Sequence, residues 1–159
     1  MSIGRYLIVV ALTLMAGAAH AQTLVGITLG EPVAAARYRI DQTIGRHEVA
    51  PPSSQVFETT YIFDRQNRLI GSMASCRGTV WSVSITVASC DDFYTLLRSH
   101  IAEWGSPIVH FLTIPFDDGS SVAEQLKYDW PQRHYGLSDP VPPSRVSGVQ
   151  TISLDARCR

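Results

Sequence analysis

Two stretches of the chain, 33–44 and 93–104, carry apolar residues at intervals of three and four, the spacing of one helix face. Pro32 precedes the first stretch and suits a first helical turn, because its missing N–H has no helical partner there. Gly45 and Gly105 follow the two stretches, as glycine often does where helices end. The pattern predicts one helix in each half of the chain.

Other stretches alternate between apolar residues and polar or small ones, which indicates strands with one covered and one wet face. The clearest is 80–87, where Val83 and the apolar residues at steps of two from it share one face. The polar segment 46–55 contains Pro51 and Pro52 and is predicted as a loop. The strands expected from this pattern are 57–63, 68–75, 80–87, 108–114, 122–130 and 149–156.

The two halves of the chain follow the same order of glycine, helix and strands. A shift of 60 residues brings Gly45 onto Gly105, and a shift of 69 brings Val83 onto Ile152 with inner and outer positions in agreement. Any two helix-and-strand units share part of this likeness, so the repeat is a hypothesis. The expected fold class is α+β, with two helix-plus-antiparallel-meander units whose helices pack on one face of the sheet. The expected boundaries are a leader at 1–21, a first unit at 22–88 and a second unit at 89–159, the two units forming one compact domain.

Residues 1–21 have the pattern of a secretory signal peptide. Arg5 provides the positive start, 7–18 is apolar, and the last three residues fit a small-x-small cleavage site. A membrane anchor is the alternative, but the apolar run is about a dozen residues long and spanning needs roughly 20. We expect cleavage after Ala21, export to the periplasm or the medium, and no transmembrane segment in the cleaved chain.

The composition fits a folded domain without a strong charge. The 159 residues include 13 Lys and Arg and 14 Asp and Glu, for a net charge of -1, and 45% of them are hydrophobic. A disordered chain would be less apolar and more charged, and a nucleic-acid binder that relies on bulk charge would be basic. Nucleic acid is therefore not an expected partner.

No common catalytic or cofactor motif occurs in the sequence. It lacks H-E-x-x-H, G-x-S-x-G and a phosphate loop, and no two histidines have metal-ligand spacing on a shared helix. We therefore expect no cofactor, no metal and no catalytic residue. His100 is expected on the inner side of its helix, and the stripe of Tyr61 and Phe63 is expected in the core. Catalysis by His100 or His134 would need a carboxylate and a serine to converge on it in three dimensions.

Three cysteines, Cys76, Cys90 and Cys158, allow at most one intramolecular disulfide. Cys76 and Cys90 lie at opposite ends of one expected strand, roughly 26 Å apart, whereas linked Cα atoms lie about 6 Å apart. Cys158 follows the strand that the repeat hypothesis equates with 80–87. Cys90–Cys158 is therefore the predicted disulfide, and Cys76–Cys158 or no bridge at all are the alternatives.

A further indication of the fold comes from the order of elements in the first half of the chain. A glycine-flanked helix is followed by a strand meander whose last strand has the pattern V-x-x-[VI]-x-[IL]. The residues that carry it are Gly30-Glu31-Pro32, Ile44-Gly45, Tyr61-Ile62-Phe63 and Val80-Trp81-Ser82-Val83-Ser84-Ile85. This order resembles small exported bacterial α/β repeat proteins, namely the β-lactamase inhibitory proteins, with two such repeats, and the small lipoproteins of the outer-membrane β-barrel assembly machine, with one. The resemblance implies helices on one side of an antiparallel sheet and an open face for a protein partner. The lipoprotein's anchoring cysteine is absent, and three cysteines cannot form the inhibitor's two disulfides, so only the architecture is carried over.

The outer face of the expected sheet is the candidate site. Short hydroxyl side chains form hydrogen bonds at little cost in side-chain entropy, and aromatic residues dominate interface hot spots. An ordinary wet sheet face is the alternative reading. The residues predicted for the face are Ser82, Ser84, Thr86, Thr151 and Ser153, with Tyr128, Trp130 and Tyr135 at its rim.

The function expected from these features is that of an exported, non-enzymatic protein-binding or inhibitor-like module with another protein as its partner. One alternative is a periplasmic binder of a small molecule or envelope component, which would use a cleft between the two units. A second alternative is a small secreted hydrolase. A broad face lined by hydroxyls favours the binding module, whereas a histidine, a carboxylate and a serine in one pocket favour the hydrolase.

Overall fold

The computed structural model describes residues 22–51, 57–115, 122–139, 148–154 and 158. The predicted signal peptide lies outside these residues. Neither helix of the described part is long and apolar enough to cross a membrane. The elements are β1 (Thr23–Leu24), β2 (Ile27–Thr28), α1 (Val33–Arg39), the π-helical turn η1 (Ile40–Ile44), β3 (Gly45–Val49), β4 (Phe57–Asp64), β5 (Leu69–Cys76), β6 (Thr79–Val87), α2 (Cys90–Trp104), β7 (Ile108–Pro115), β8 (Val122–Trp130), the short 3-10 helix η2 (Pro131–Arg133), β9 (Tyr135–Ser138) and β10 (Gly148–Ser153).

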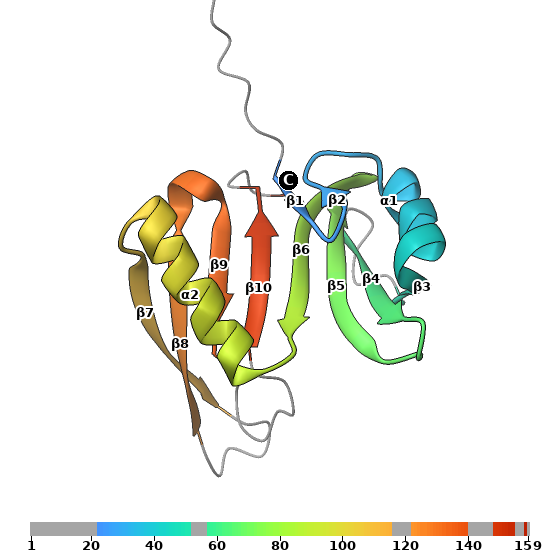
Figure 1. Cartoon of the computed structure of the whole chain (residues 1–159). Coiled ribbons are helices and arrows are strands. Elements are labelled where there is room, and N and C mark those ends of the chain that lie inside the picture. Colours follow the sequence, from blue (N-terminus) through green and yellow to red (C-terminus); the bar gives the residue numbers. More distant parts are fainter. Residues whose placement is uncertain (1–21, 52–56, 116–121, 140–147, 155–157, 159) are drawn as a thin grey trace, which may run out of the picture.

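Eight of the strands form one antiparallel sheet in the order β3-β4-β5-β6-β10-β9-β8-β7 (Figure 1). The first half of the chain supplies four neighbouring strands and the second half supplies the other four. The halves meet at the pair β6–β10, where Val83 lies opposite Ile152 and Ser84 lies opposite Thr151. Strands β3 and β7 are the two edges of the sheet.

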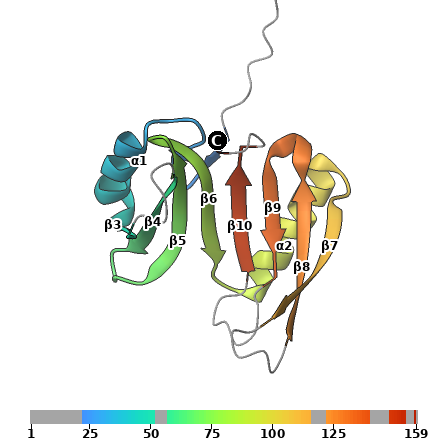
Figure 2. The ribbon, with the colours of Figure 1, turned by 180° about the vertical axis from the view of Figure 1, so that it is seen from behind.

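The hydrophobic core lies on one face of this sheet. Ala36 and Ile40 from the first helical segment, Phe93 from α2 and Ile27 from the β1–β2 hairpin belong to a single buried cluster with the inward residues of the strands. Figure 1 shows α2 in front of the sheet, and Figure 2 shows the opposite face in front of α2. No helix or strand among the described residues covers this second face, which we call the open face.

The predicted fold class of two helix-plus-meander units is wrong. The described residues form one continuous eight-stranded antiparallel sheet with only two α-helices, so the fold is mainly β. Strand β3 was not predicted because 46–48 is a run of polar residues, yet it pairs with β4, where His47 lies opposite Ile62. Charged side chains are common on edge strands because they discourage pairing with other chains, so a polar stretch can still be a strand. Strand β9 was not predicted either, because it is too short to show a period and contains Gly136.

Alternation predicts the faces of β6 correctly from Ser82 to Val87, and the cap of α2 is also as predicted. The expectation that Trp81 shares the face of Val83 is wrong, because the register shifts near the start of β6 and Val80 takes the buried position instead. Val83 and Ile85 of β6 are buried, while Ser84 between them is half-buried on the open face. The hydroxyl of Ser89 accepts a hydrogen bond from the backbone N–H of Asp92 (3.1 Å) and so caps α2, as the capping-box spacing indicates.

The predicted disulfide Cys90–Cys158 is wrong, and the first alternative is present instead. Cys76 and Cys158 are linked, with their Cα atoms 5.7 Å apart, and Cys90 is free and exposed. The repeat hypothesis equated the end of β10 with the end of β6. Because β10 runs antiparallel to β6, its end lies beside the start of β6 and therefore near Cys76.

Candidate functional site: the open face of the sheet

The centre of the open face is a floor of short hydroxyl side chains on β6 and β10. The hydroxyl oxygens of Ser84 and Thr151 lie 2.9 Å apart, so one donates to the other across the central strand pair. Ser82 donates to the backbone oxygen of Ile152 (3.1 Å), and Thr86 donates to the backbone oxygen of Ile70 (3.0 Å). A hydroxyl that donates once still accepts through its lone pairs. The floor is therefore held in place and presents acceptor oxygens to solvent.

The register places the fifth predicted hydroxyl on the same floor. Ser153 lies directly opposite Ser82 in the antiparallel pair β6–β10. Residues directly opposite each other point to the same face of a sheet, so all five predicted hydroxyl residues share the open face.

An aromatic bank lies beside this floor, on β4 and at the start of β6. Phe57 and Trp81 make an edge-to-face contact with ring centroids 5.9 Å apart. Tyr61 is exposed and belongs to the same cross-strand row as Ser84. The guanidinium of Arg46 lies over the ring of Phe63, with its carbon 3.8 Å from the ring centroid.

The prediction that Tyr61 and Phe63 lie in the core is wrong. Alternation separates the two faces of a strand but does not say which one is covered. In β4 both faces carry large side chains, and Thr60 and Ile62 are the fully buried ones.

A charged bank lies on the other side of the floor, on β7 and β8. Asp129 lies 3.0 Å from the ammonium of Lys127 and 3.2 Å from Nε2 of His110. Gly136 makes room for this cluster, because a Cβ there would lie 2.7 Å from a carboxylate oxygen of Asp129. These residues were not among the predicted site residues, although the alternation of Lys127 and Asp129 on a predicted strand places both on one face.

The three aromatic residues predicted for the rim of the open face lie on the opposite face. Trp130 is 2% exposed and its indole N–H donates to the backbone oxygen of Gly105 (2.8 Å). Tyr135 is buried, which raises the pKa of its phenol, and Tyr128 packs edge-to-face with Phe93. Because Asp129 points to the open face, its neighbours on β8 must point to the core. The prediction that Tyr128, Trp130 and Tyr135 form a rim is therefore wrong.

His100 lies on the inner side of α2, as expected, within a group of aromatic rings. It stacks on Trp104 with ring centroids 4.0 Å apart, and Trp130 and Tyr135 contact it edge-on. Neither ring nitrogen has a hydrogen-bond partner, and burial lowers the pKa of the imidazole. His100 therefore does not form the histidine–carboxylate pair that a triad mechanism requires.

A pocket of about 260 Å³ lies where β8, η2 and β9 meet, and its lining includes His134, Asp129 and Ser153. These are the residue types of a hydrolytic triad. In a triad, however, the carboxylate orients the histidine, whereas the Asp129 carboxylate is already paired with Lys127 and His110. The volume also falls below the ~300–1,000 Å³ of typical small-molecule sites.

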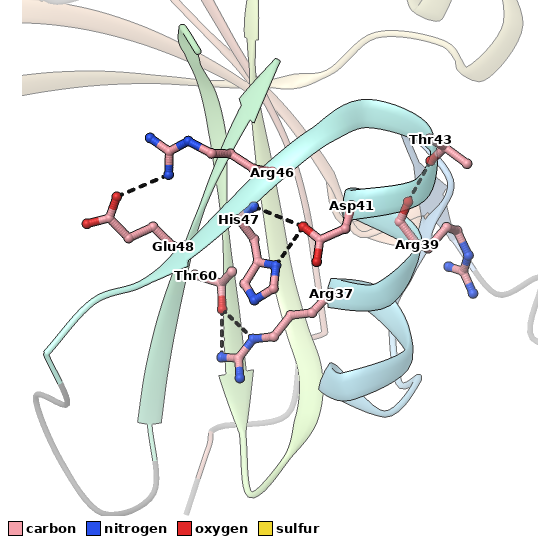
Figure 3. A network of polar contacts seen from close by, with 8 residues as sticks. All are labelled: Arg37, Arg39, Asp41, Thr43, Arg46, His47, Glu48 and Thr60. Carbon is pink, nitrogen blue, oxygen red and sulfur yellow. Dashed lines mark hydrogen bonds and ion pairs between the residues drawn. The ribbon is translucent and has the colours of Figure 1, made fainter. Parts of the chain in front are cut away.

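A second polar network fastens the first helical segment to the sheet on the core side (Figure 3). Arg37 donates to the buried hydroxyl of Thr60 (2.8 and 3.1 Å) and pairs with Glu58. Asp41 accepts from the backbone N–H of His47 (3.2 Å) and lies 2.9 Å from its Nδ1. These contacts join α1 and η1 to β3 and β4, so their first role is to hold the fold.

No group of three or more His, Cys, Asp or Glu residues in the described part of the chain is arranged to hold a metal ion. No protein-family model matches the chain, and neither a curated protein nor a solved structure shows significant similarity to it. The resemblance to the inhibitory and lipoprotein repeat families therefore stays a prediction, and the open face itself is the basis for any functional proposal.

Proposed function

We propose that the protein is an exported, non-enzymatic binding module that recognises another protein with the open face of its sheet. The observation that carries the proposal is the contrast between the two faces. One face is covered by α1, α2 and the β1–β2 hairpin, whereas no described element covers the other. Export follows from the predicted signal peptide and belongs to the proposal.

The floor of the open face suits a rigid protein surface. Ser84 and Thr151 have short side chains that are already fixed by their mutual hydrogen bond. Ordering such side chains on binding costs little, because the loss of rotamer freedom is largest for long side chains and these are short. The floor therefore offers shape and acceptor oxygens at a small penalty.

The two banks supply the remaining requirements of an interface. Tyrosine, tryptophan and arginine are the residues most often found at interface hot spots, and Tyr61, Trp81 and Arg46 all belong to the aromatic bank. The charged bank supplies both signs of charge close together, which fixes the orientation of a partner more than it adds affinity. Floor and banks together span strands from both halves of the sheet, which suits a protein better than a small molecule.

The experiment that tests the proposal is capture of partners from the envelope and the medium of the producing cell. The full chain is expressed with an affinity tag, and Ser84→Arg and Thr151→Arg are compared with Arg98→Glu, a change on the exposed side of α2. We expect one stoichiometric partner that is lost with both floor variants and kept with the helix variant.

A matched pair of tyrosine variants separates loss of binding from misfolding, which the arginine substitutions in the floor could cause. Tyr61 is 40% exposed on the open face and Tyr38 is 69% exposed on α1, so alanine at either position leaves the core intact. Loss of the partner with Tyr61→Ala but not with Tyr38→Ala supports the proposal. A partner that is retained by Tyr61→Ala and by both arginine variants contradicts it.

A further inference from the structure

The two edges of the sheet differ in how they are protected. The edge strand β3 exposes Arg46 and Glu48, which discourage the addition of another strand. The edge strand β7 reads Ile-Val-His-Phe-Leu-Thr-Ile-Pro and contains no Asp, Glu, Lys or Arg. An eight-residue edge strand without charges is a ready template for pairing with another strand.

Large apolar side chains are exposed on both sides of β7. Phe111 and Val109 point to the helix side of the sheet, yet they are 62% and 54% exposed, so α2 does not cover them. Ile108 and Leu112 are exposed on the other side. A monomeric soluble protein rarely exposes so much apolar surface at one edge unless something binds it.

The edge offers a second strand both backbone hydrogen bonds and apolar side chains. Four exposed apolar side chains lie on β7, two on each side of the sheet, so a strand that pairs there also covers apolar surface: Ile108, Val109, Phe111 and Leu112. Because the edge is one strand wide, the contact belongs to the small interfaces that form reversible pairs. Pro107 and Pro115 lack a backbone N–H and bound the segment that can pair to 108–114.

We propose that β7 pairs antiparallel with β7 of a second copy of this chain, with Phe111 opposite Phe111, so that the two sheets become continuous. A second copy fits because β7 carries no Asp, Glu, Lys or Arg that would repel its own image. In a two-fold antiparallel pair, opposite residues point to the same face, and centring on Phe111 places the most exposed of the large apolar side chains described on β7 in an aromatic pair. Both open faces then lie on the same side of the joined sheet. The inference concerns the edge alone and does not rest on the proposed function.

The test is the oligomeric state of the form that accumulates when the full chain is expressed, measured by sedimentation velocity over a hundredfold range of concentration. We expect a concentration-dependent dimer. Val109→Lys and Phe111→Lys are each expected to raise the dimer dissociation constant at least tenfold. Leu69→Lys and Tyr38→Lys change side chains of matched exposure (54% and 69%) away from β7 and are expected to leave it unchanged.

A cysteine variant tests the register. In a Cys90→Ser background, Phe111→Cys is expected to form an intermolecular disulfide on mild oxidation, whereas Tyr38→Cys is not. A wild-type chain that stays monomeric over the whole concentration range overturns the inference. A dimer that survives both lysine substitutions in β7 also overturns it.

Discussion

Cys76 at the end of β5 and Cys158 near the end of the chain are bonded to each other across 82 residues, with their Cα atoms 5.7 Å apart. The bond joins the first half of the chain to the last residues after β10. It reinforces the central pair β6–β10, through which the two halves share one sheet.

Loss of this disulfide is expected to destabilise the fold. In the chain-entropy treatment, a closed loop of this length contributes about 4.5 kcal/mol. In urea denaturation, Cys76→Ser is expected to show a lower midpoint concentration and a free energy of unfolding reduced by about that amount. Cys90→Ser is the control, because Cys90 is free and exposed, and its midpoint should match that of the wild type. Equal midpoints for Cys76→Ser and the wild type would show that the bond contributes nothing.

The stability of the fold is expected to fall in mild acid because of His100. Burial lowers the pKa of its imidazole below the ordinary 6.5, and nearby Glu103 opposes this only in part. The unfolded chain therefore binds a proton more readily than the folded chain, so stability is complete above pH 6.5 and decreases as the pH falls below it. Thermal unfolding between pH 7.5 and 5 measures the effect. His100→Phe should reduce this decrease, and an unchanged pH profile in that variant would contradict the assignment.

Arg37 is expected to be important for the attachment of α1. Arg37→Met leaves the buried hydroxyl of Thr60 without its donor and Glu58 without its cation, at a cost of about 1–3 kcal/mol. Chemical denaturation measures the loss. Arg98→Met, on the exposed side of α2, is expected to change stability by less than about 0.5 kcal/mol. Similar losses in the two variants would mean that the network has no special role.

Gly136 is expected to tolerate no side chain. In Gly136→Ala the new Cβ would displace the Asp129 carboxylate and disturb its pairing with Lys127 and His110, at a cost of about 1–3 kcal/mol. The decisive comparison is with the double variant Gly136→Ala, Asp129→Ala, in which the clash is absent. A double variant no more stable than Gly136→Ala alone would contradict the proposed cause.

The sequence predicted local structure well where one physical pattern acts alone. The alternation around Val83 and the cap at Ser89 both depend on neighbours in the chain, and both are present in the structure. It failed for β3, where Arg46 and Glu48 follow the rule for sheet edges rather than the rule for half-buried strands.

The remaining errors share one cause, which is that tertiary pairing is not visible in local sequence. The disulfide depends on the antiparallel direction of β10 relative to β6. The placement of Tyr61 on the open face and Trp130 in the core depends on which face the helices cover. The five hydroxyls of the floor were predicted for one face because alternation within β6 and within β10 is readable from the sequence, whereas the pairing of the two strands with each other was not predicted.

The most direct test of binding at the open face is site-specific photo-crosslinking in the producing cell. A photo-reactive amino acid replaces Tyr61 on the open face in one sample and Tyr38 on α1 in another. We predict that one partner protein becomes crosslinked in near-stoichiometric yield from position 61 and not from position 38. Crosslinking from position 38 alone, or no crosslink from position 61, would contradict the proposal that the open face binds a protein.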